Sequence, residues 1–109
     1  LGGHMWLSNY TGTMTTNGAT NVTVDLSEYT GSGTTFAKHI VGASYLSNDA
    51  TWYGSGSPQA LINGDTNVVI KGKEGVTFTG MIAGASFTEH KANSTVTGST
   101  NINISNIYT

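Results

Sequence analysis

Apolar and polar residues alternate along three short segments of the chain. In the first segment, Val22, Val24 and Leu26 occupy every second position, with polar residues between them. The same alternation returns in two later segments: Val68 and Ile70, then Ile102 and Ile104. A period of two places successive side chains on opposite faces of a strand, so each segment is predicted to be a strand with one buried face.

Two sequence motifs also repeat, and they alternate along the chain. The first, Gly-x-Thr-Asn, precedes each alternating segment, at residues 18–21, 64–67 and 98–101. The second begins with Thr-Phe and continues, after three residues, as Ile-x-Gly-Ala-Ser and an aromatic residue. It spans residues 35–45 and 77–87 with identical spacing. Two different motifs in strict alternation indicate a repeat architecture.

A partial copy of the second motif opens the chain at residues 1–6. Taking Gly3, Gly42 and Gly84 as equivalent gives repeats of 39 and then 42 residues. One such repeat cannot bury its own apolar face, whereas stacked copies can. The sequence therefore predicts an all-β fold, a right-handed parallel β-helix (β-solenoid) of about three coils of roughly 40 residues.

Stacking at the strand spacing of about 4.8 Å would bring equivalent side chains into columns. Three columns are predicted: Asn21 with Asn67 and Asn101, Phe36 with Phe78, and Trp6 with Tyr45 and Phe87. Stacked asparagines can hydrogen-bond through their side-chain amides. Neighbouring aromatic rings stabilise by about 0.5–1.5 kcal/mol beyond the burial of their area. These columns explain the recurring residue types without a catalytic site.

Residues 1–109 are predicted to form a single β-solenoid segment. Neither end of the sequence resembles the polar cap that solenoids need for solubility. This pattern favours an internal slice of a longer repeat array, and the alternative is a subunit that polymerises end to end.

The middle repeat carries extra residues, at 46–63, and Gly-Ser-Gly-Ser-Pro at 54–58 is typical of a loop. Insertions in a solenoid map to loops on one face, which is often the binding face. Trp52 and Tyr53, together with Asp49, are the candidate ligand-contact residues, because two large aromatic rings in a loop can form a platform for a sugar. In the alternative interpretation, the two rings fold over the edge of the solenoid and cover its core.

Charge narrows the range of partners. Only 9% of the residues are charged, the net charge is −2, and arginine is absent. Typical domains are about 25% charged. Nucleic acid is not an expected partner, because phosphate binding needs clustered cations. No apolar run approaches the roughly 18 residues of a membrane span, and the absence of cysteine excludes disulfides and thiol chemistry.

The titratable residues do not form a recognisable catalytic pattern. Asp25 and Asp65 lie beside the repeated asparagine strand in different registers, and no two acidic residues are two positions apart on one strand. Paired carboxylates would be needed for acid–base work on polysaccharides. The three histidines, His4, His39 and His90, are not at equivalent positions of the repeat. A metal site would need its ligands to converge. The sequence predicts no enzyme activity, no cofactor and no metal.

The segments Gly-Asp-Thr-Asn-Val-Val-Ile (64–70) and Val-Thr-Phe-Thr-Gly-Met-Ile-Ala-Gly-Ala-Ser (76–86) resemble the degenerate repeats of β-helical bacterial surface proteins. Autotransporter passengers and adhesin-like proteins are the nearest comparison. The resemblance covers nearly the whole chain. It implies an extracellular or bacterial cell-surface location, a right-handed β-helix, and a role in adhesion or display. It carries over no catalytic residues.

The leading hypothesis is therefore a structural or adhesive segment that binds a host surface glycan or protein through exposed loops on a rigid solenoid. Two alternatives stay open. One is a polysaccharide-acting β-helix enzyme or tailspike-like depolymerase. The other is a fibre subunit that associates with itself end to end.

Overall fold

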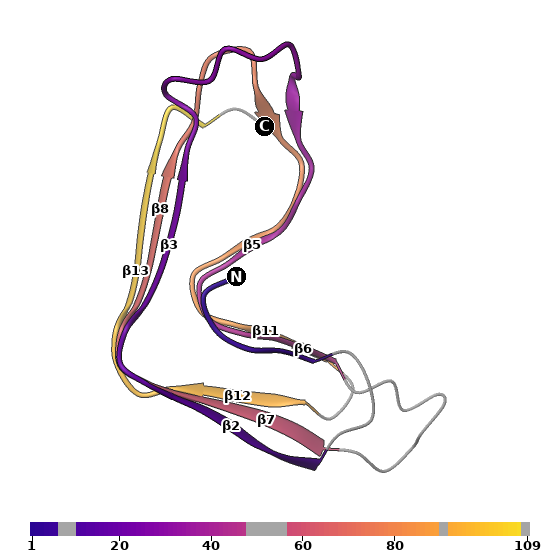
Figure 1. Ribbon diagram of the computed structural model, residues 1–109, viewed down its shortest axis with the longest axis vertical. Helices are drawn as coiled ribbons and strands as arrows, with labels where there is room; N and C mark the ends of the chain where they lie inside the picture. Colours follow the sequence, from indigo (N-terminus) through magenta and orange to yellow (C-terminus); the bar gives the residue numbers. More distant parts are fainter. Residues whose placement is uncertain (7–10, 48–56, 90–91, 108–109) are drawn as a thin grey trace.

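The computed structural model describes residues 1–6, 11–47, 57–89 and 92–107 (Figure 1). All regular structure in these residues is β-strand, which confirms the predicted all-β class. The strands are β1 (Met5–Trp6), β2 (Thr11–Asn17), β3 (Thr20–Asp25), β4 (Thr35–Phe36), β5 (Ile40–Val41), β6 (Tyr45–Ser47), β7 (Ser57–Asn63), β8 (Thr66–Lys71), β9 (Thr77–Phe78), β10 (Ile82–Ala83), β11 (Phe87–Glu89), β12 (Asn93–Val96) and β13 (Thr100–Ser105).

The chain runs through the same series of strands repeatedly. Strands β1 to β5 form a first coil, β6 to β10 a second, and β11 to β13 a third. Equivalent strands pair side by side, in the orders β1-β6-β11, β2-β7-β12, β3-β8-β13, β4-β9 and β5-β10. Every pairing is parallel. The parallel stacking confirms the coarse architecture that the repeats predict, with the second coil between the other two.

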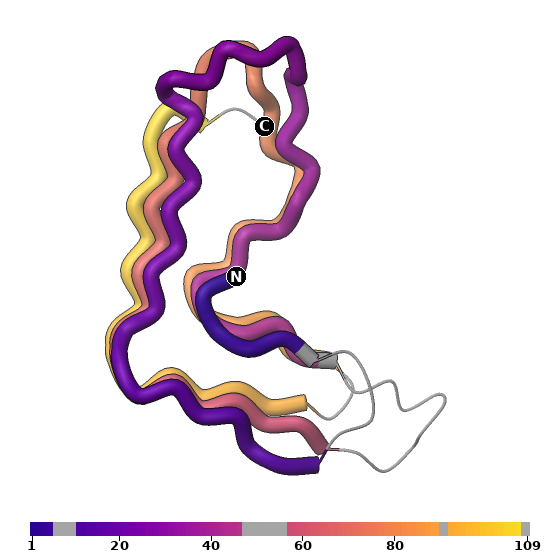
Figure 2. Tube along the Cα trace, viewed as in Figure 1, coloured from indigo at the N-terminus to yellow at the C-terminus, as the bar shows by residue number. Residues whose placement is uncertain are grey.

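Seen along the stacking direction, the three coils superpose closely (Figure 2). The stack β3-β8-β13 forms one long wall, and β5 bends inward toward it from the opposite side (Figure 1). Below this bend, β6 and β11 run above β7 and β12 (Figure 1). The molecule measures 45 × 30 × 17 Å, and its shortest dimension lies along the stack.

The predicted alternation of side chains is observed in the long wall. In β8, Val68 and Ile70 point inward and are 1% and 0% exposed, and they form a buried cluster with Ile40 and Phe78. A second group of buried side chains lies on β6 and β7: Leu46, Ala60 and Ile62. The inward side chains of the second coil therefore pack between those of the first and third coils.

The first coil pairs one residue out of the expected register. Met5 lies beside Tyr45 and Trp6 beside Leu46, so the prediction that Trp6 stacks on Tyr45 is wrong. The cause is the pair of consecutive glycines, because Gly2 rather than Gly3 takes the position of Gly42. The Gly2 N–H donates to the carbonyl of Val41 at 3.0 Å.

Close approach of the backbones explains why glycine stands at position 2. A Cβ atom at Gly2 would collide with the Gly42 carbonyl oxygen of the next coil, and it would also lie 3.0 Å from the Thr20 Cβ. Glycine is therefore required where this segment passes close to Gly42. The separation between the first two coils here is 40 residues, as between His4 and Ser44, and not the expected 39.

The extra residues of the middle repeat occupy a shorter span than predicted. Tyr45–Ser47 is strand β6 and Ser57–Asn63 is strand β7, so the predicted insertion at 46–63 is wrong at both ends. Pro58 is buried within β7 and pairs with Gly12 of β2, while β12 begins opposite the next residue, Gln59. The missing N–H of Pro58 is tolerated because one side of β7 is unpaired there.

Candidate functional site

Three asparagines lie in one column on the outer face of the long wall. Asn21 pairs with Asn67, and Asn67 pairs with Asn101. The Asn67 Nδ2 donates to the Asn21 Oδ1 at 3.0 Å, and the Asn101 Nδ2 donates to the Asn67 Oδ1 at 3.0 Å. Each amide thus satisfies its neighbour, and the column has a direction: donors point toward the first coil.

A shorter column of the same kind starts at the end of β2. The Asn63 Nδ2 donates to the Asn17 Oδ1 at 2.9 Å, in the same direction as the longer column. This pair was not predicted from the sequence. The sequence feature that could have predicted the pair is the position of each asparagine, three residues before the threonine of the repeated Thr-Asn pair.

Aromatic rings stack between coils at two places. The rings of Phe36 and Phe78 are stacked with centroids 5.1 Å apart, and those of Tyr45 and Phe87 with centroids 5.0 Å apart. Both pairs were predicted from the repeat. Met5 occupies the position beside Tyr45 in the first coil, where the repeat predicted Trp6.

Buried threonines hold the long wall to the inward bend. The Thr20 hydroxyl donates to the Gly42 carbonyl at 2.7 Å, and the Thr66 hydroxyl donates to the Gly84 carbonyl at 2.8 Å. Both threonines are buried. A buried carbonyl group without a hydrogen-bond partner destabilises the folded state. The two hydroxyls supply that partner to the glycine carbonyls. Thr and Gly recur in each repeat, but the bonded pairs are 22 and 18 residues apart, so their contact across the core was not predicted.

A column of small polar groups lines the inner corner next to this bend. The Ser44 Oγ accepts from the His4 N–H at 3.1 Å, and the Ser86 Oγ accepts from the Ser44 N–H at 3.1 Å. The His4 ring is half-buried, and its Nε2 lies 2.9 Å from the Thr16 hydroxyl. His4 is therefore part of the packed corner.

The charged groups that the structure describes are spread over the surface. Hydrogen bonds from the Ser27 hydroxyl and the Ser27 N–H, with a smaller contribution from Lys71, hold the pKa of Asp25 below its usual value. The Asp65 carboxylate accepts from the Ser99 N–H at 2.8 Å. These carboxylates organise turns, and no group of three or more potential metal ligands occurs in the described residues.

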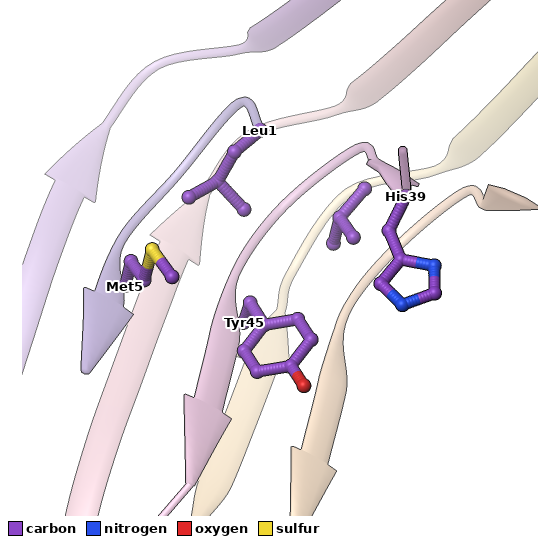
Figure 3. Close-up of a pocket in the computed structure, with 5 residues that line it drawn as sticks. Leu1, Met5, His39 and Tyr45 are labelled. Atoms are coloured by element: carbon purple, nitrogen blue, oxygen red, sulfur yellow. The ribbon is translucent and has the colours of Figure 1, made fainter. Parts of the chain in front are cut away.

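A shallow apolar pocket of about 300 Å³ opens beside the first coil. It is lined by Leu1, Met5, His39, Val41 and Tyr45 (Figure 3). Leu1 and Met5 are about half exposed. This pocket was not predicted from the sequence, because the repeat placed Trp6, and not Met5, beside Tyr45.

The predicted ligand-contact residues Asp49, Trp52 and Tyr53 lie outside the described residues. The strands on either side of them are well packed: Leu46 of β6 is 0% exposed and Pro58 of β7 is buried. Strands β6 and β7, on either side of these residues, therefore belong to the packed stack.

The two ends of the stack expose groups that are covered in the middle coil. Ile102 and Ile104 of the third coil are 48% and 40% exposed, although their counterparts Val68 and Ile70 are buried. We call the outer edges of β1, β2 and β3 the first-coil end, and those of β11, β12 and β13 the third-coil end. Each presents a row of strand edges whose backbone groups have no neighbouring strand in the described part of the chain.

In comparisons with known proteins, the chain matches no protein-family model, no curated protein and no solved structure. Among the residues that the structure describes, no helix has the length and hydrophobicity to cross a membrane.

Proposed function

We propose that this chain is a rigid structural segment of a secreted or cell-surface protein, built as a right-handed parallel β-helix, which displays a binding loop. The observation that carries the proposal is the continuity of the side-chain columns. The asparagine column passes through all three coils with hydrogen bonds of the same length. Such a stack is stiff along its axis, because each coil is held by backbone and side-chain bonds to the next.

The right-handed winding follows from the crossover rule for parallel strands. Connections between parallel strands of one sheet are right-handed in the great majority of proteins, because the twist of the strand favours that path. The strands β3, β8 and β13 are such parallel neighbours, and each connection between them passes through a whole coil.

The segment between β6 and β7 is the proposed adhesive element. In the third coil, three residues (90–92) make the equivalent connection between β11 and β12, because Glu89 pairs with Ser47 and Asn93 with Gln59. The second coil uses residues 48–58 for the same step, of which Ser57 and Pro58 already belong to β7. Binding residues are often carried on loops that a rigid scaffold positions. The extra length, with Trp52 and Tyr53, supports a contact with a surface glycan or protein.

The test exchanges this connection for the short one. Replacing residues 48–58 with the sequence of residues 90–92 should preserve the β-sheet circular dichroism and abolish attachment to host cells or to a glycan array. A second variant, Trp52→Ala with Tyr53→Ala, keeps the length of the loop and should lose the same attachment. Attachment that persists in both variants, each still folded, would show that this loop is not the binding element.

A further inference from the structure

We propose that Asn63 is a site of spontaneous chemical modification, at which the Gly64 nitrogen attacks the side chain to form a succinimide that opens to aspartate and isoaspartate. This inference goes beyond the proposed function and does not depend on it. Two Asn-Gly pairs, at 17–18 and 63–64, lie at equivalent corners, where β2 and β7 end and the chain turns into the long wall. The geometry of the two corners favours reaction at the second pair.

The stacking of the coils accounts for both residues of this reactive pair. The Asn63 Nδ2 donates to the Asn17 Oδ1 at 2.9 Å, so the asparagine belongs to a column between the first two coils. A Cβ atom at Gly64 would collide with the Gly18 carbonyl group of the coil before it, so only glycine allows the two backbones to approach. A glycine after asparagine also leaves no side chain to hinder ring closure at its nitrogen. The contacts that hold the corner together therefore create a reactive sequence.

The reaction requires only these two residues and water. The Gly64 nitrogen forms a bond to the Asn63 Cγ, the bond between Cγ and Nδ2 breaks, and the amide leaves as ammonia with the proton that the Gly64 nitrogen loses. Water then adds to one of the two carbonyl carbons of the cyclic imide. Cleavage between the nitrogen and Cγ gives aspartate. Cleavage of the bond between the nitrogen and the main-chain carbonyl carbon gives isoaspartate, in which the main chain passes through Cβ and Cγ.

The two pairs differ in the hydrogen bonding of the attacking nitrogen. The Gly18 N–H donates to the Asn63 carbonyl at 2.9 Å. The Gly64 N–H makes no hydrogen bond within the part of the chain that the structure describes. At the next corner the bond runs in the opposite direction, since the Gly98 N–H donates to the Gly64 carbonyl at 3.1 Å. The Gly64 nitrogen can therefore turn toward Cγ without first losing a partner.

The other features of the two asparagines do not distinguish them. Both residues are exposed, so water can reach either ring. The bond between their side-chain amides is shared, and reaction at either residue breaks it. The hydrogen bond of the Gly18 N–H is the remaining difference, and a typical hydrogen bond corresponds to a factor of about two to ten in rate. Asn17 should therefore react more slowly than Asn63 by about that factor.

Conversion of Asn63 would change the corner in two ways. The Nδ2 donor to Asn17 is replaced by a carboxylate oxygen, which places a second negative charge two residues from Asp65. Isoaspartate also lengthens the main chain immediately before Gly64, where the backbones of adjacent coils are in close contact. The isoaspartate form should therefore melt at a lower temperature than the form with ordinary aspartate.

Peptide mapping of the folded chain after incubation at mildly alkaline pH tests the proposal. Mass spectrometry should find aspartate and isoaspartate accumulating at residue 63 about two- to tenfold faster than at residue 17. Equal rates in the folded chain, or faster conversion of Asn17, would overturn the assignment. The same incubation in denaturing urea removes the hydrogen bond of Gly18 and should reduce the difference between the two rates. An unchanged ratio in urea would show that the neighbouring residues, and not this bond, cause the preference.

Two variants complete the test. Asn63→Thr is the matched control, because Thr97 occupies the equivalent corner of the third coil, and it should fold like the wild type without any conversion at residue 63. Asn63→Asp carries the charge of the product on an ordinary main chain and should melt close to the wild type. The isoaspartate form, separated by ion exchange from the incubated wild type, should melt below Asn63→Asp. Equal melting temperatures would contradict the predicted effect on the corner.

Discussion

The buried hydroxyl of Thr66 makes a demanding prediction about stability. Thr66 is 0% exposed, and its hydroxyl donates to the Gly84 carbonyl at 2.8 Å. Thr66→Val keeps the shape of the side chain but removes the donor and leaves a carbonyl oxygen in the core without a partner. Leaving a buried acceptor unsatisfied costs about 1–3 kcal/mol, so the free energy of unfolding should fall by that amount.

Urea denaturation followed by circular dichroism measures this change. With an m-value of about 1–3 kcal/mol per molar urea, the midpoint should fall by roughly 1 M. Thr20→Val is a replicate at the equivalent position in the first coil, because Thr20 is also buried and donates to the Gly42 carbonyl at 2.7 Å. The matched control is Thr23→Val, at an exposed position of the neighbouring strand β3, which should change the stability by less than about 0.5 kcal/mol.

Two results would refute this reasoning. If Thr66→Val and Thr20→Val are as stable as the wild type, the glycine carbonyls do not depend on these hydroxyls. If Thr23→Val costs as much as the other two, the loss reflects a general effect of replacing threonine by valine in this wall, and not the bond across the core.

The remaining predictions concern the aromatic stack, the inward bend and one carboxylate. Phe78→Ala should cost about 3–5 kcal/mol by urea denaturation, because Phe78 is 5% exposed, and the half-buried Phe36 should cost less when changed to alanine; equal losses would contradict the burial pattern. Gly42→Ala should destabilise by about 3 kcal/mol, since the new Cβ would collide with a carbonyl oxygen of the next coil; an unchanged melting temperature would show that the coils are not in contact there. The folded-state pKa of Asp25 is lowered by Ser27, so the stabilisation from Asp25 is present above its unfolded pKa of about 3.9 and is lost as the pH falls through the folded value. An NMR titration of the Asp25 carboxyl should therefore give a midpoint below about 3.9, and Asp25→Asn should remove this part of the acid dependence.

Much of the fold could be predicted because equivalent positions of the repeats carry the same types of residue. The Gly-x-Thr-Asn motif fixes the start of each strand in the long wall, and the alternation after it fixes which side chains point inward. Asn21, Asn67 and Asn101 therefore lie at paired positions. The Thr-Phe motif in the same way predicts the contact between Phe36 and Phe78.

The failures have physical causes that sequence patterns do not contain. Two adjacent glycines left the register of the first coil ambiguous, and the backbone pairing of the first two coils places Gly2 beside Gly42. Proline is usually a sign of a loop, yet Pro58 lies in β7 where one side of that strand has no neighbour. The bond between Thr66 and Gly84 joins different walls of one coil, and its partners share no periodicity along the chain.

The pairing of the asparagine side chains tests the account most directly. In NMR spectra with assigned side-chain amides, the Nδ2 protons of Asn67 should show nuclear Overhauser effects to Asn21, and those of Asn101 to Asn67, as expected for amides joined at 3.0 Å. If these protons instead contact residues of other walls, or if Asn101 lies nearer to Asn21 than to Asn67, the coils do not stack in this register and the structural role inferred from them is wrong.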